Sequence, residues 1–219
     1  MVELVQQLAL WAVPVLAAVI LHEVAHGFVA FRLGDSTAAR AGRLTLNPLP
    51  HIDPFGTVAL PALLIAINAP FLFGYARPVP VNFANLRSPK RDMVLVAAAG
   101  PLTNLLLAVG SALLFRWLLH LEVPAGAAWG GPLLGALTPV ALMARNSVLV
   151  NVVLAVFNLL PILPLDGGRV LAGLLPLRQA VAFSQLEPYG MMIVLTLMAT
   201  NVLGQVVGPV VSAVLHVLL

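Results

Sequence analysis

The chain has 219 residues, of which 61% are hydrophobic and only 9% are charged. A soluble domain carries about 25% charged residues, so this composition excludes an ordinary soluble protein and indicates several membrane-spanning segments. The net charge of +3 fits anionic lipid headgroups better than nucleic acid, and the absence of cysteine excludes disulfides and thiolate metal ligands.

Five long apolar segments run along the chain, and each approaches the roughly 20 residues that a helix needs to cross a bilayer. They cover approximately residues 5–31, 57–73, 92–119, 132–165 and 190–219. Prolines inside the second and fourth segments leave open whether each crosses once, crosses twice or dips in and returns. The sequence therefore predicts an all-α polytopic membrane protein with about four to six transmembrane segments.

The first segment contains His22-Glu23-x-x-His26, in an apolar run with no Lys or Arg before Arg32. Two histidines four residues apart lie on one face of a helix and can bind one metal ion. Ionisable groups are costly at membrane depth, so a zinc site is the first interpretation, with Glu23 beside the metal as general base. The alternative is a set of buried polar residues satisfied by neighbouring helices, as in a transporter.

The region between the first and third segments is expected to differ from the rest. Residues 38–46 alternate well enough to predict a short pair of strands, and residues 78–82 predict a second extended stretch. Residues 57–73 either cross the bilayer or re-enter it. Arginines flank this segment on both sides, and positive residues prefer the cytoplasm, which favours the re-entrant form. We therefore predict a small β-hairpin or re-entrant region after the first span.

A catalytic zinc ion with two histidine ligands lacks one of its usual three protein ligands. Of the eight acidic residues, most fall in loops or near span ends, so Asp53 and Asp166 remain as candidates. Asp166 is favoured because prolines before it and glycines after it predict a broken helix, which is tolerated at membrane depth where it lines a polar cavity. A helix cap or an ion pair with Arg169 is the alternative for Asp166. His51 and Asp53 remain rival ligands, or groups that orient a liganding imidazole, or a surface histidine and a cap.

Three motifs carry a resemblance to a known family. They are His22-Glu23-x-x-His26, Gly100-Pro101-x-x-Asn104 and Asn158-x-x-Pro161-x-x-x-Leu165-Asp166-Gly167. In these motifs the chain resembles the site-2 protease family of intramembrane zinc metalloproteases, in its short prokaryotic form. The resemblance implies that His22, His26 and Asp166 bind one zinc ion per chain. It also implies that Glu23 is the general base and that Asn158 stabilises the oxyanion or positions the substrate.

The expected activity is hydrolysis of peptide bonds in or near the transmembrane segments of membrane-anchored proteins. The resemblance implies single-span substrates. The composition and charge predict contact with the lipid bilayer and no nucleic-acid partner. The rival interpretation is a metal-ion transporter or a non-catalytic metal-binding membrane protein, which has no need of a base at Glu23. The sequence does not define the oligomeric state.

A single integral membrane domain is expected over residues 1–219, with a core over about 5–175 and a C-terminal span over about 190–219. This length leaves no room for the PDZ or nucleotide-binding regulatory domains of some relatives. The zinc ligands must meet at one depth, so the first and fourth segments must run in the same direction. Together with the arginines, this predicts a multi-pass protein of the cell membrane, with both termini outside and its active site toward the cytoplasmic side.

Overall fold

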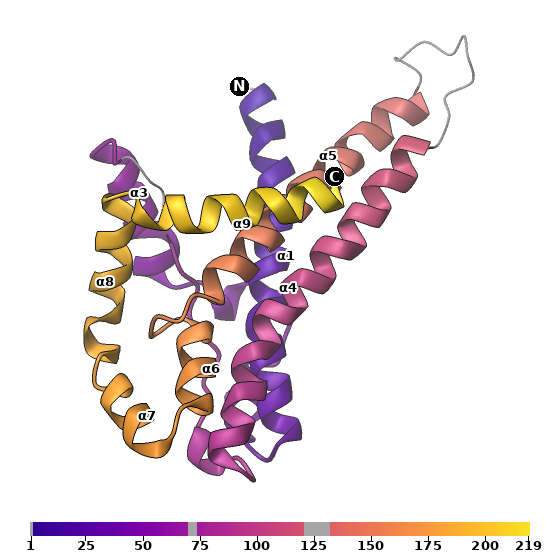
Figure 1. Ribbon diagram of the computed structural model, residues 1–219. Helices are drawn as coiled ribbons and strands as arrows, with labels where there is room; N and C mark the ends of the chain where they lie inside the picture. The colour runs from indigo at the N-terminus through magenta and orange to yellow at the C-terminus, as the bar shows by residue number, and fades with distance from the viewer. Residues whose placement is uncertain (1, 70–73, 121–131) are drawn as a thin grey trace.

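The computed structural model describes residues 2–69, 74–120 and 132–219, and this part of the chain contains helices and no strands. Three long helices form the centre of the molecule (Figure 1): α1 (Val2–Arg32), α4 (Pro89–His120) and α5 (Pro132–Asn158). Shorter helices surround them: α2 (Thr37–Arg40), α3 (Leu60–Ala66), α6 (Asp166–Leu174), α7 (Leu177–Ser184), α8 (Glu187–Ala199) and α9 (Val202–Leu218). Single turns of 3-10 or π helix cover Leu49–His51, Pro54–Ala59 and Phe83–Asn85.

Helix α4 is the central element, because it packs against α1, α5 and α6. Its buried face is a stripe of small residues at helical spacing, namely Ala97, Gly100, Asn104, Ala108 and Ala112. Small side chains let helix backbones approach closely, which is how membrane helices gain packing energy. Ala108 and Ala112 pack against Val148 and Val152 of α5 in one buried cluster.

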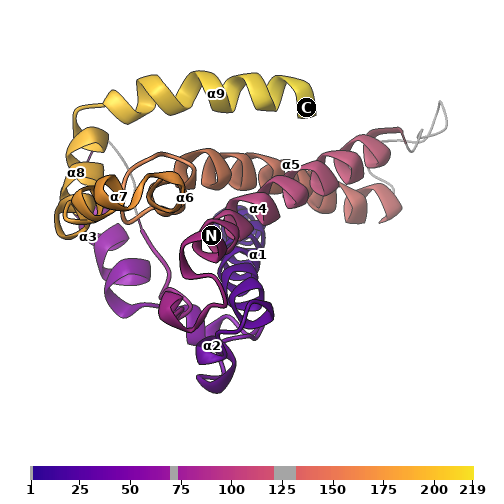
Figure 2. The ribbon, with the colours of Figure 1, turned by 60° about the horizontal axis from the view of Figure 1, so that its bottom comes forward.

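Three helical stretches are long and apolar enough to cross a membrane: Gln6–Arg32, Pro89–His120 and Leu137–Asn158. The pair α7 and α8, bent by 64°, would make a fourth if it counts as one span. The all-α membrane architecture agrees with the sequence prediction, whereas the number of spans among the described residues reaches the predicted four to six only if the bent pair counts as one span. The predicted C-terminal span over 190–219 is instead divided between α8 and α9, because Asn201 adopts a left-handed conformation between them (φ 58°). Helix α9 then packs against α5, above which it runs in Figure 2.

The predicted β-hairpin is wrong for the residues that the structure describes. Residues 38–46 form the end of α2 followed by turns. The cause is Asp35, whose carboxylate accepts hydrogen bonds from both the backbone N–H and the hydroxyl of Thr37 and so starts a helix. Residues 78–82 belong to no strand, because Pro78 and Pro80 lack the N–H groups that a sheet ladder needs.

The chain between α2 and α4 leaves the bundle and returns to the same place. The helical stretch Pro54–Ala66 is shorter than the roughly 20 residues of a span. Residues 70–73 of the predicted segment lie outside the described residues. Beyond them, the Tyr75 N–H donates to the Gly56 carbonyl (3.0 Å). This return is the path that the re-entrant alternative requires. Among the three long helices, α1 and α5 both run downward in Figure 1, while α4 runs upward.

Candidate metal centre

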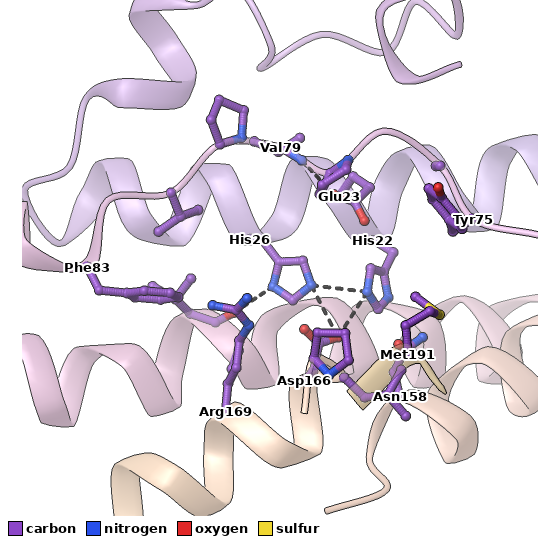
Figure 3. Close-up of a pocket in the computed structure, with 18 residues that line it drawn as sticks. His22, Glu23, His26, Tyr75, Val79, Phe83, Asn158, Asp166, Arg169 and Met191 are labelled. Atoms are coloured by element: carbon purple, nitrogen blue, oxygen red, sulfur yellow. Dashed lines mark hydrogen bonds and ion pairs between the residues drawn. The ribbon is translucent and has the colours of Figure 1, made fainter. Parts of the chain in front are cut away.

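Two histidines of α1 and one aspartate of α6 meet in a single cluster (Figure 3). The Nε2 atoms of His22 and His26 lie 3.0 Å apart. The Oδ2 atom of Asp166 lies 3.1 Å from Nε2 of His22 and 3.3 Å from Nε2 of His26. Helix periodicity brings the two imidazoles to one face of α1, and the packing of α6 against α4 brings Asp166 to them. The three predicted ligands are therefore together.

Hydrogen bonds to the far side of each imidazole determine which nitrogen carries the proton. Nδ1 of His26 donates to the Val96 carbonyl (2.7 Å), which can only accept. Nδ1 of His22 donates to Oδ1 of Asn104, and the Asn104 amide is oriented by its own Nδ2, which donates to Oδ1 of Asn151 (2.7 Å). Both Nε2 atoms therefore present lone pairs to the centre of the cluster.

The cluster offers a site for a cation between its members. When both imidazoles are neutral with their protons on Nδ1, the two Nε2 lone pairs face each other across 3.0 Å and repel. Oδ2 of Asp166 is buried and has no hydrogen-bond partner among the described residues. Buried carboxylate oxygens without partners are rare and costly unless a metal ion binds them.

The geometry and the donor types fit zinc. Tetrahedral ligands about 2.0–2.1 Å from a zinc ion lie about 3.3 Å from one another. The three distances between the ligand atoms are 3.0, 3.1 and 3.3 Å. Two neutral imidazoles and one carboxylate are a ligand set of catalytic zinc sites, which keep a fourth position for water or substrate.

Gly100 of α4 provides the space for the imidazoles. A Cβ atom at this position would lie 2.4 Å from Nε2 of His26 and 2.6 Å from Nε2 of His22. Real side chains do not approach so closely, so any other residue would displace the two ligand atoms. The glycine of the Gly100-Pro101-x-x-Asn104 motif is therefore a part of the site, as is its asparagine.

A cavity of about 640 Å³ opens beside the cluster, and Glu23 and Asn158 line it together with the three ligand residues. Oε2 of Glu23 accepts a hydrogen bond from the backbone N–H of Val79 (2.7 Å). Asn158, the last residue of α5, uses one amide N–H on the Leu154 carbonyl of its own helix (2.9 Å). An amide carries two N–H groups, so a second donor belongs to this side chain.

Three other residues considered in the sequence analysis, Arg169, Asp53 and His51, lie outside the metal cluster. Arg169 pairs with Glu187 (3.1 Å) rather than with Asp166. Asp53 accepts hydrogen bonds from the N–H groups of Phe55 and Gly56, which is a helix cap. His51 is buried, with Nε2 3.0 Å from the Thr45 carbonyl oxygen, so neither it nor Asp53 belongs to the metal cluster or orients its imidazoles.

Two groups of the site were outside the sequence prediction. The backbone carbonyl of Val96 cannot be predicted from the sequence as a partner of His26, because every residue has a backbone carbonyl. Asn104 entered the sequence analysis only as the last residue of the Gly100-Pro101-x-x-Asn104 motif, with no role assigned, whereas it is fully buried and supports His22. Its position, four residues after Gly100 on a helix that also carries a buried stripe, was the available signal.

Comparison with known proteins agrees with this geometry. Residues 133–200, which contain Asn158 and Asp166, match peptidase family M50. The chain is 40% identical over 195 residues to "Putative zinc metalloprotease YwhC" of Bacillus subtilis (strain 168), in a match that covers 88% of this chain and 81% of the relative.

More distant relatives carry the same kind of name. The chain is 34% identical over 192 residues to "Putative zinc metalloprotease Rip2" of Mycolicibacterium smegmatis, covering 87% of this chain and 66% of that protein. Its match to Rip2 of Mycobacterium tuberculosis (strain H37Rv) is 35% identical over 156 residues and covers 71% of this chain and 53% of the relative. No solved structure matches the chain.

Proposed function

The chain belongs to peptidase family M50 and is an intramembrane zinc metalloprotease, and on this premise we propose that His22, His26 and Asp166 bind its zinc ion. The observation that carries the proposal is the convergence of three lone-pair atoms within 4.8 Å of one another, one of them a buried carboxylate oxygen that has no hydrogen-bond partner among the described residues. The reported relatives bear protease names, and nothing in the comparisons supports the rival metal-ion transporter.

The proposed chemistry divides among three kinds of residue. When bound, the zinc ion would polarise the scissile carbonyl and lower the pKa of its water toward about 7. Glu23 follows His22 directly on α1 and faces the same cavity, so its carboxylate takes a proton from the attacking water and later returns it to the leaving amine. Asn158 donates its second amide N–H to the oxyanion.

The proposed substrates are membrane-anchored proteins with a single span, cleaved in or beside that span. The cavity supports this class, because its wall away from the metal cluster is largely apolar. The apolar lining includes Val79, Val81, Phe83, Leu165 and Met191. An apolar segment of a substrate can enter such a cavity without leaving polar side chains unpaired.

The proposed orientation places the zinc site toward the cytoplasmic side of the cell membrane. Arginines support it, because Arg40 and Arg43 precede the excursion at Pro54–Ala66 and Arg77 and Arg87 follow its return. Positive residues near membrane segments prefer the cytoplasm.

The test uses the purified protein, reconstituted with model single-span substrates. We expect Glu23→Gln to keep one zinc ion per chain and to lose cleavage by about 10²–10⁴-fold, since a general base contributes about that much. Asp166→Ala is expected to lose the zinc ion as well. Glu187→Gln is the matched control, because this carboxylate pairs with Arg169 outside the metal cluster. Wild-type cleavage by Glu23→Gln at full zinc content would disprove the proposed role of Glu23.

A further inference from the structure

One side of the cavity is formed by chain without regular secondary structure, residues 74–82, called here the covering segment (Figure 3). It is attached to the rest of the molecule near both ends. The Arg77 N–H donates to the His51 carbonyl (2.9 Å), and the Asn82 N–H donates to the Asp35 carboxylate (2.7 Å). A segment held at both ends occupies a defined position over the site.

Between these attachments the covering segment meets Glu23. The N–H of Val79 donates to Oε2 of Glu23 at 2.7 Å, the bond drawn between the two residues in Figure 3. Pro78 and Pro80 have no N–H, so Val79 carries the single amide proton between Arg77 and Val81. A bond from an N–H to a carboxylate is charge-assisted and stronger than one between neutral groups.

A glycine in α1 leaves the space in which the covering segment packs against the helix. Gly27 lies one helical turn after Glu23, and a Cβ atom there would lie 2.7 Å from Cγ1 of Val79 and 2.6 Å from Cδ2 of Leu44. The absence of a side chain at Gly27 therefore leaves room for the Val79 side chain, which is only 6% exposed.

Arg43 also holds the covering segment, through two of its backbone carbonyls. Its Nη2 donates to the Arg77 carbonyl (2.7 Å) and to the Pro78 carbonyl (3.3 Å). The side chain is buried, and it bonds to the two carbonyls that immediately precede the Val79 N–H. Fixing these carbonyls fixes the direction of the next N–H along the chain.

We propose that the backbone N–H of Val79 is the positioning group for Glu23, with Gly27 and Arg43 holding it in place. The inference rests on the proposed role of Glu23 as general base. By binding Oε2, the Val79 N–H stops rotation of the carboxylate and leaves Oε1 as the oxygen that receives the proton. A carboxylate that is already oriented transfers a proton faster than one that rotates freely. This orientation does not involve the residues that bind the metal.

The first test removes the N–H and keeps the rest of the segment. Val79→Pro deletes the donor, and Val79→Ala shortens the side chain and retains the donor. We expect kcat of Val79→Pro to fall about 10–100-fold below that of Val79→Ala at equal zinc content and similar KM, the loss of one hydrogen bond to a charged group. Equal kcat values in the two variants would overturn the proposal.

A backbone ester at position 79 covers the case in which proline prevents folding. The ester retains the valine side chain and replaces only the N–H by oxygen, and we expect the same loss of kcat. Arg43→Lys and Arg43→Ala extend the test, because lysine can still donate to a carbonyl: kcat should fall less in the former than in the latter. An ester variant with wild-type kcat would overturn the proposal.

The second test does not depend on activity. Hydrogen exchange of a peptide over residues 77–80 isolates the Val79 amide, since its first residue becomes an amine and Pro78 and Pro80 carry no N–H; an overlapping peptide that begins earlier reports the Arg77 amide. We expect Glu23→Ala to speed exchange at Val79 by about tenfold or more, while the Arg77 amide, bonded to His51, stays protected. Unchanged protection at Val79 would overturn the contact.

The outcomes separate this inference from the proposed function. Loss of cleavage in Glu23→Gln together with equal kcat in Val79→Pro and Val79→Ala overturns the positioning role alone. Full cleavage by Glu23→Gln overturns the role of Glu23 and, with it, the inference.

Discussion

Two regions enclose the catalytic cavity, and they hold their functional groups in different ways. On the helical side, His22 and His26 are supported by α4, through Asn104 and the Val96 carbonyl, inside a packed bundle. On the other side, the covering segment holds Glu23 by one backbone N–H and has no regular structure of its own. With the proposed roles of these residues, metal binding and proton transfer are supported by separate parts of the protein, so substitutions should separate zinc content from rate.

The largest effect is expected on the helical side, from Gly100→Ala. The new Cβ would fall 2.4–2.6 Å from the Nε2 atoms of His22 and His26 and displace both ligands. We expect the purified variant to contain no zinc and to show no cleavage, as measured by metal analysis and by the model-substrate assay.

Gly110→Ala is the matched control on the same helix. A Cβ at Gly110 would meet nothing within 4 Å among the described residues. Alanine favours helix over glycine, so this variant should keep zinc and activity and melt no lower than the wild type. Full zinc content in Gly100→Ala would contradict the arrangement described for the helical side.

A smaller effect is expected from Asn104→Ala, which removes the partner of the His22 Nδ1 proton. Loss of a group that orients a liganding histidine weakens metal binding by about 10–100-fold, and competition with a chelator would measure it. Asn146→Ala is the control, because Asn146 is also buried but bonds to the Leu10 carbonyl (3.1 Å). Equal zinc affinity in the two variants would show that Asn104 acts through general packing.

The smallest effect concerns Asp35, which ties the covering segment to the end of α1. Burial raises the pKa of Asp35, but hydrogen bonds from Thr37, Asn85 and the Asn82 N–H outweigh it and bring the pKa below its usual value of about 3.9. The ionised carboxylate therefore stabilises the folded state at pH values above the usual pKa of an aspartate. This contribution to the free energy of unfolding is lost as the pH falls through the lower pKa of the folded state.

Melting temperatures measured against pH check this expectation. The wild type should melt a few degrees above Asp35→Asn near neutral pH, and the two curves should converge below about pH 4. A constant difference at every pH would mean that ionisation of Asp35 contributes nothing.

The two regions also differ in how far the sequence predicts them. Helix periodicity predicted that His22 and His26 lie together, and Glu23 was predicted from its place in their motif. Asp166 was favoured over Asp53 because prolines and glycines predict a broken helix around it, so the sequence could predict which residues meet on the helical side. A single C-terminal span was predicted because apolar composition does not reveal that Asn201 adopts a left-handed conformation and divides this segment into α8 and α9.

The covering segment was harder to predict. Alternation over residues 38–46 favoured strands, but a short-range signal, the Asp35 carboxylate bonding to Thr37, decided for a helix. The contact between Val79 and Glu23 has no side-chain pattern at all, because the donor is a backbone N–H. A glycine at position 27, one turn after the expected base, was the nearest available sign.

The contacts of Asn104 in α4 have a consequence for the order in which the site forms during biosynthesis. Its amide joins three helices, through His22 and the Ala18 carbonyl of α1 and through Asn151 of α5. A ribosome delivers α1 first, so the unfinished chain carries its histidines before their support exists, and Asp166 emerges later still. With the proposed ligand set, proteolytic capacity therefore begins only after Asp166 has been synthesised.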